Sequence, residues 1–144
     1  MVNKIFWSVI IILVALAGFF SANYYLLSTK KTKVVSPNEN FRNLNLVAGQ
    51  KISSPLKISG EVRGNWFFEA SFPVFVVDWD GRIIAQGVAQ AKSSWMTTDF
   101  VPFEATLQFT KPAYGKNGAI ILKKDNPSGL PANDAAYEIP VVFE

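Results

Sequence analysis

Alternation of hydrophobic and polar residues dominates the chain after residue 45 and predicts β-strands. In PLKISGEVR, residues 55–63, every second position is apolar or Gly. The same period of two recurs in VPFEATLQFT, residues 101–110, and in YEIPVVFE, residues 137–144, while GAIILKK, residues 118–124, is a shorter candidate. Successive side chains of a strand point to opposite faces, so this pattern is typical of strands with one buried and one solvated face.

The densest apolar run of this region is GNWFFEASFPVFVVDWDG, residues 64–81. Written as one strand, its even-numbered face is wholly apolar and predicts a core face that contains Trp66, Phe68, Ala70, Phe72, Val74 and Val76. The opposite face begins mixed and ends with Phe75, Val77 and Trp79. These three side chains either pack under a neighbouring segment or form an exposed patch.

Turn signals between the apolar runs predict the fold class. Asp80-Gly81 is typical of a tight hairpin turn because Gly tolerates positive φ, so residues 82–91 are expected to be the partner strand. Six strands are expected, or seven if LVAGQKI at residues 46–52 contributes one, and no helical periodicity follows residue 45. Short strands with turns at regular intervals predict an all-β, antiparallel β-sandwich at residues 46–144.

The N-terminus has a different pattern, an uncharged apolar run over residues 5–27. Its 23 residues exceed the roughly 20 that a helix needs to cross a bilayer. One transmembrane helix is therefore expected within residues 1–27, with the lipid bilayer as its partner. A cleaved signal peptide is the alternative, since Ala15-Leu16-Ala17 has a small-x-small form, but cleavage there would leave an apolar stub.

A polar, basic stretch follows and predicts a tether between the anchor and the domain at residues 28–45. Its Lys30, Lys31 and Lys33 favour a cytoplasmic position for this flank, whereas Lys4 favours a cytoplasmic N-terminus. Charge alone therefore leaves the orientation of the anchor open.

Composition excludes several classes of function. The net charge is +3, but from Asn45 onward nine Lys and Arg face ten Asp and Glu, so the folded part has no excess of base. A nucleic-acid partner is not expected. The absence of Cys and His excludes disulfides, zinc sites built from these residues, and Ser-His-Asp or Cys-His catalysis.

Several blocks of the domain resemble a known family. They are SPLKISGEVRG (54–64), WFFEASFPVFVVDWDG (66–81), WMTTDFVPFEATLQF (95–109), and KDNPSGLP followed by EIPVVF (124–143). Together they are similar to the immunoglobulin-like domain of bacterial spore germination proteins. The resemblance implies an immunoglobulin-like β-sandwich at residues 46–144, on the outer side of a bacterial membrane with the N-terminus inside, and it brings no catalytic residues. No companion germination module accompanies the domain in this chain, so a role in germination does not follow.

Oxygen-rich segments are the candidates for metal or catalytic sites. Asp78 and Asp80 are accounted for by turn chemistry, and the loop at residues 123–138 matches no named calcium motif although its oxygen ligands, Asp125, Asn126, Ser128 and Asp134, could converge on Ca²⁺. A carboxylate pair for glycoside hydrolysis would have to come from Glu69, Asp99 and Glu104, which are expected on solvated faces. No metal or cofactor is predicted.

Aromatic residues are the remaining candidates for binding. Trp79, Trp95, Phe75 and Trp66 are predicted as possible contacts to a protein partner or a glycan, because aromatic rings anchor interfaces and stack on sugars. Trp66 or Trp79 could instead fill the core, and Trp95 is expected to be the more exposed side chain. The sequence thus predicts a non-catalytic, membrane-anchored, extracytoplasmic module that contacts an envelope protein. A glycan-binding domain is the alternative.

Overall fold

The computed structural model describes residues 38–144. The predicted transmembrane helix at residues 1–27 and most of the predicted tether lie outside the described residues. Within residues 38–144, none of the helical segments has the length and apolar character needed to span a membrane. This part of the chain forms strands and two short 3₁₀ turns, η1 (Gly64–Trp66) and η2 (Pro131–Asn133), which confirms the prediction of an all-β domain.

Eight strands are present between residues 38 and 144, two of them very short. They are β1 (Phe41–Arg42), β2 (Gln50–Ile52), β3 (Leu56–Arg63), β4 (Ser71–Asp78), β5 (Ile83–Ala91), β6 (Phe100–Leu107), β7 (Asn117–Lys123) and β8 (Ala136–Phe143). The segment LVAGQKI does supply one of them, β2. The predicted six or seven strands are therefore a slight undercount, because a strand as short as β1 contains no alternation to detect.

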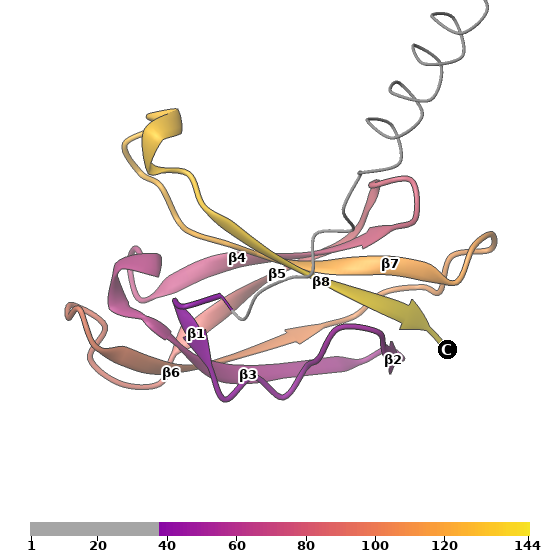
Figure 1. The fold of residues 1–144 in the computed structure, drawn as a ribbon, viewed down its shortest axis with the longest axis horizontal. Coiled ribbons are helices and arrows are strands. Elements are labelled where there is room, and N and C mark those ends of the chain that lie inside the picture. The colour runs from indigo at the N-terminus through magenta and orange to yellow at the C-terminus, as the bar shows by residue number, and fades with distance from the viewer. Residues whose placement is uncertain (1–37) are drawn as a thin grey trace, which may run out of the picture. The chain divides into compact units, whose positions relative to one another are not determined.

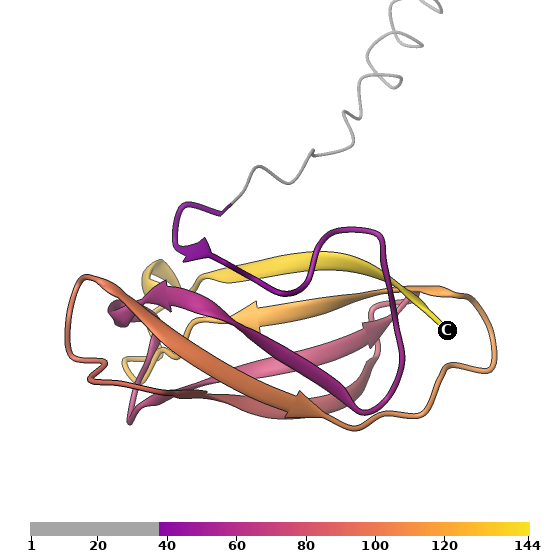
Figure 2. The ribbon, with the colours of Figure 1, turned by 90° about the horizontal axis from the view of Figure 1, so that it is seen from below.

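The strands form one curled sheet in the order β1-β3-β6-β5-β4-β7-β8-β2. Strand β5 pairs with β4 along Ser71–Val77 and with β6 only through Gln90↔Glu104 and Ala91↔Phe103. This short link joins two packed layers, which Figures 1 and 2 show from two directions. One layer holds β1, β3 and β6, and the other holds β5, β4, β7, β8 and β2.

Strand β2 departs from the predicted antiparallel architecture, because it runs parallel to β8 with Gln50 opposite Val141. Between β1 and β2 the chain crosses from the edge of one layer to the edge of the other. Gly49, at φ 81°, turns the chain into this path and donates its N–H to the Pro140 carbonyl at 2.8 Å. Both edges of the sheet are thus covered by very short strands, which limits edge-to-edge pairing with other chains.

The core lies between the layers and is built from the alternating positions that the sequence predicted. Buried side chains come from both layers, and the largest are Trp66, Phe72, Phe103, Phe143, Ile58, Leu107, Ile120 and Leu122. Edge-to-face aromatic contacts run through it, with ring centroids 5.1 Å apart for Phe72–Phe103 and 4.6 Å apart for Phe41–Trp66. Burial of these faces is the main source of stability.

The apolar run at residues 64–81 is not one strand, which corrects the prediction. Phe68 and Ser71 exchange backbone hydrogen bonds of 3.0 Å around Glu69 and Ala70, whose φ angles are 50° and 62°. This left-handed turn reverses the chain, so strand β4 begins only at Ser71. Trp66 is buried and Phe68 exposed as a result, while the alternation holds within β4 at Phe72, Val74 and Val76.

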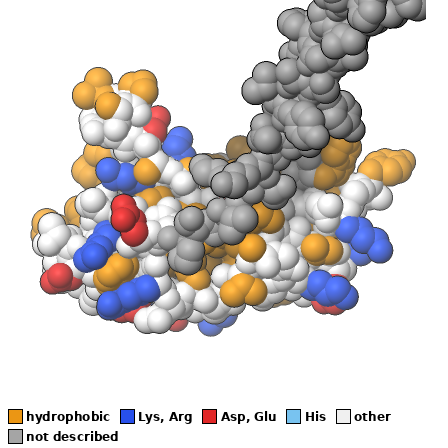
Figure 3. Space-filling view, viewed as in Figure 1, with side chains coloured by type: hydrophobic (Ala, Val, Ile, Leu, Met, Phe, Trp, Pro, Cys, Tyr) orange, Lys and Arg blue, Asp and Glu red, His pale blue; other side chains and the backbone are white. Residues whose placement is uncertain are grey.

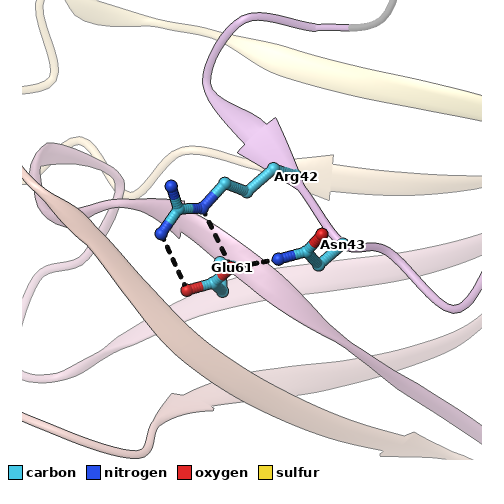
Figure 4. Close-up of polar contacts among 3 residues, drawn as sticks. All are labelled: Arg42, Asn43 and Glu61. Atoms are coloured by element: carbon cyan, nitrogen blue, oxygen red, sulfur yellow. Dashed lines mark hydrogen bonds and ion pairs between the residues drawn. The ribbon is translucent and has the colours of Figure 1, made fainter.

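The folded unit also begins earlier than the predicted boundary at residue 46. Phe41 in β1 is buried in the core, and the Asn45 N–H donates to the Ser59 carbonyl at 3.0 Å. Figure 4 shows that Arg42 binds both carboxylate oxygens of Glu61, at 2.9 and 3.0 Å, while Asn43 donates to the same carboxylate. Residues 41–45 are therefore part of the domain rather than of a tether.

Candidate interaction surface

The connections between strands gather at two opposite ends of the domain. We call residues 79–82 and 108–116, the β4–β5 turn and the β6–β7 loop, the tip; they lie at the right of Figure 1. We call residues 64–70, 92–99 and 124–135 the loop end. Backbone hydrogen bonds from Gly64 to Asp99 and from Asp125 to Trp66 hold the three segments of the loop end together.

The β4–β5 turn places Trp79 at its apex. The Asp78 carboxylate accepts hydrogen bonds from the N–H groups of Asp80, at 3.0 Å, and Arg82, at 2.9 Å. Gly81 has a φ of 77° and donates its N–H to the Asp78 carbonyl. The predicted hairpin is confirmed, and Asp78 and Asp80 serve the turn.

Trp79 rests against the β6–β7 loop, so the two parts of the tip form one surface. A Cβ atom built on Gly115 would lie 2.4 Å from Trp79 Cδ1, which means that the indole packs on the bare backbone. Strands β4 and β7 bring these segments together by pairing Asp78 with Gly118. The Trp79 side chain nevertheless remains 63% exposed.

Two further exposed apolar side chains lie close to Trp79 or its contact Gly115 along the chain. Tyr114, next to Gly115 in the chain, is 83% exposed, and Ile83 is 60% exposed at the start of β5. Figure 3 shows hydrophobic side chains over the end where the β6–β7 loop lies, together with basic side chains and an acidic one. We call Trp79, Ile83 and Tyr114 the aromatic patch. Exposed Trp and Tyr side chains make this end of the domain a candidate interaction surface.

A shallow depression of about 370 Å³ lies at the same end of the domain. It is lined by Ser54, Ile84, Gln108, Phe109 and Thr110, three of which are polar. The Ser54 hydroxyl accepts the Phe109 N–H at 2.9 Å. The depression is open to solvent and makes the surface of the tip concave at this point.

The other predicted aromatic contacts have different surroundings. Trp66 is 2% exposed and belongs to the core, so it is removed from the set of contacts. Trp95 is half-buried and packs against the core, which corrects its expected place as the more exposed tryptophan. The polar neighbours of Trp95 misled the prediction, because a loop side chain can fold back over the end of a sandwich.

Phe75 remains a candidate contact on a second surface. It is half-buried and pairs with Ile121, while its neighbour Val77 pairs with Ala119 across the same two strands. None of these four residues belongs to the central core cluster, so they form a satellite on the outward face of β4 and β7. Of the three side chains whose position the sequence left open, Phe75 and Val77 therefore belong to this satellite, and Trp79 is exposed separately.

The oxygen-rich candidates have structural partners. Asn126 Nδ2 donates to Asp134 Oδ1 at 2.8 Å, and the Ser128 hydroxyl donates to Asn126 Oδ1, so these groups brace the β7–β8 loop. Glu104 pairs with Lys92 at 3.2 Å. Asp99 bonds Thr97. Within residues 38–144 there is no group of three or more Asp and Glu side chains placed to hold a metal ion.

The role of Gly115 and the exposure of Ile83 were missed from the sequence. Tyr114-Gly115 signals a turn, but nothing in the linear pattern indicates that Trp79 packs on that glycine. The contact follows from the pairing of β4 with β7, which are separated by two other strands in the chain.

Comparison with known families gives one match. The family model described as the immunoglobulin-like domain of bacterial spore germination matches residues 47–129. The matched range runs from before β2 into the β7–β8 loop and includes the whole tip. Comparisons with curated proteins and with solved structures found no match.

Proposed function

Because this chain belongs to the family of immunoglobulin-like domains of bacterial spore germination, we propose that it is a non-catalytic protein-interaction module that works through its tip. An immunoglobulin-like sandwich is a rigid scaffold that presents loops at its two ends. The family membership supports the class of function, and the residues of the tip supply the surface.

The observation that carries this proposal is the seating of Trp79 on Gly115. An exposed indole that is already held in place loses little conformational entropy when a partner covers it. Tyr114 and Ile83 extend the same surface with further exposed area. Trp and Tyr are the side chains most often found at the energetic centre of protein interfaces.

We further propose that the module is held at a bacterial membrane by residues 5–27 and lies on the extracytoplasmic side. The uncharged length of that segment and the family resemblance support this location. The described chain enters the domain at the loop end, where Arg63 N–H donates to Asn40 O at 3.0 Å.

The location is tested by labelling a single cysteine in intact cells. The chain contains no Cys, so Ala132→Cys in the exposed β7–β8 loop provides a unique thiol. A membrane-impermeant maleimide should label it without lysis, and the protein should fractionate with membranes. Labelling only after lysis, or a soluble cytoplasmic protein, would contradict the proposed location.

The contact function is tested by chemical cross-linking at the cell surface followed by mass spectrometry. The double variant Trp79→Ala/Tyr114→Ala should lose the protein neighbours that the wild type captures. Met96→Ala/Leu130→Ala is the matched control, because it removes two exposed apolar side chains from the loop end. Identical neighbours for the wild type and the tip variant would refute the tip as the contact.

Glycan binding is the alternative function, and it is favoured by the exposed indole of Trp79. A flat ring supported by backbone on one side can stack a sugar on its other side. Co-sedimentation of the full chain with peptidoglycan, compared between wild type and Trp79→Ala, distinguishes the two. Sedimentation of the wild type that Trp79→Ala abolishes would favour the glycan; no sedimentation by either would remove it.

A further inference from the structure

We propose that the partner of the tip is an acidic protein segment, which Lys111 and Lys116 recognise beside the aromatic patch. This inference rests on the proposed function and names the chemistry of the partner. It is carried by two exposed lysines of the tip that have no acidic partner within residues 38–144.

The two ends of the domain differ slightly in charge, although the domain as a whole is nearly neutral. The tip carries three basic side chains and, with the Asp78 carboxylate that binds its turn, two acidic ones; these are Arg82, Lys111, Lys116, Asp78 and Asp80. The loop end carries three basic side chains, since Arg63 donates to the Thr98 carbonyl, and four acidic ones; these are Arg63, Lys92, Lys124, Glu69, Asp99, Asp125 and Asp134. The net charge is thus +1 at the tip and −1 at the loop end, and the aromatic patch lies at the positive end.

The positive charge of the tip comes from two lysines without an acidic partner. Arg82 binds Asp80 at 3.2 Å, and this pair is electrically neutral. Lys111 and Lys116 are exposed and form no ion pair within residues 38–144. Residues 1–37 contain no Asp or Glu that could supply one. Two uncompensated cations in the loop that also bears Tyr114 attract an anionic partner.

A protein segment fits this surface better than a bilayer surface does. The tip is at the opposite end of the domain from Asn40, where the described chain enters. Its aromatic patch supplies area for apolar side chains of a partner, and the two lysines supply complementary charge for neighbouring carboxylates. The interaction is expected to weaken with added salt, because all of the charges involved are exposed.

The test uses the full chain in nanodiscs of neutral phosphatidylcholine. Its binding to a fluorescent random copolymer of glutamate and tyrosine is measured at low and high salt. Lys111→Glu/Lys116→Glu should bind at least tenfold more weakly than wild type. Lys123→Glu/Lys124→Glu makes the same change in net charge near the loop end and should bind within twofold of wild type.

Equal binding by the wild type and the tip variant would overturn the inference. Tip-dependent binding to phosphatidylglycerol vesicles or to an acidic polysaccharide, without binding to the copolymer, would also overturn it and assign the lysines to another anion. Failure here is distinguishable from failure of the proposed function. If Trp79→Ala/Tyr114→Ala loses its protein neighbours while the lysine variant keeps them, the contact stands and the acidic partner is wrong.

Discussion

At the scale of single residues, Gly115 and Glu61 fix the positions of side chains that lie far away in the sequence. Gly115 offers bare backbone to the Trp79 indole in a conformation, φ 78°, that other residues rarely adopt. Glu61 receives Arg42 and Asn43 and holds β1 against β3. Neither partnership can be predicted from local sequence, because each depends on how the strands pair.

The first prediction concerns the seat of Trp79. Gly115→Ala should displace the indole and reduce the capture of protein neighbours through the tip. Gly129→Ala is the control, since its φ is 65° but nothing lies within 4 Å of the added Cβ. Both variants should lose about 1 kcal/mol of unfolding free energy from backbone strain. Only Gly115→Ala should lose the neighbours; equal losses would mean that the indole is not positioned by this contact.

The second prediction concerns the pH dependence of the Glu61 pairing. Hydrogen bonds from Arg42 and then from Asn43 lower the pKa of Glu61 below its ordinary value of 4.5. A lowered pKa in the folded state stabilises the domain above the unfolded pKa, and this contribution disappears as the pH falls through the lowered value. The stabilisation by Glu61 should therefore be present at pH 7. It should be lost as the pH falls below 4.5 and through the lowered pKa of Glu61.

Urea unfolding of the full chain in neutral detergent, compared between wild type and Glu61→Gln, measures this effect. The wild type should be the more stable protein at pH 7. The difference should shrink once the pH lies below the lowered pKa. An unchanged difference at both pH values would show that the carboxylate charge does not contribute.

At the scale of secondary structure, alternation predicted the long strands well. Strands β3, β6, β7 and β8 begin and end within a few residues of the predicted segments, and the hairpin between β4 and β5 has the predicted turn. The failures have physical causes. Apolar residues continue through the left-handed turn at Glu69 and Ala70, so the pattern alone could not separate Trp66 from β4.

The third prediction tests the corrected N-terminal boundary of the domain. Phe41 contacts Trp66 and Tyr137, with ring centroids 4.6 and 5.3 Å away. Phe41→Ala should therefore cost about 3–5 kcal/mol of unfolding free energy in denaturant titrations. Val47→Ala, at a position that is 64% exposed, should change it by less than about 0.5 kcal/mol. A negligible change in unfolding free energy for Phe41→Ala would show that residues 41–45 belong to the tether and not to the domain.

At the scale of the whole molecule, curling of one sheet creates two ends of different character. The tip is positive and carries the aromatic patch, whereas the loop end is negative and receives the N-terminal segment of the described chain. The sequence indicated Trp79, Trp95, Trp66 and Phe75 as separate candidates. That Trp79 packs on Gly115 at the tip, and that Trp66 and Trp95 do not belong to this surface, required the arrangement of the strands.

The proposed function requires that the tip contacts a protein at the cell envelope. The direct measurement is photo-cross-linking in living cells with a photoreactive amino acid at residue 114, compared with the same amino acid at residue 128 in the loop end. We predict a defined cross-linked protein from residue 114 only, and its loss when Trp79 is replaced by Ala. Equal cross-linking from both positions, or none from residue 114, would contradict the claim.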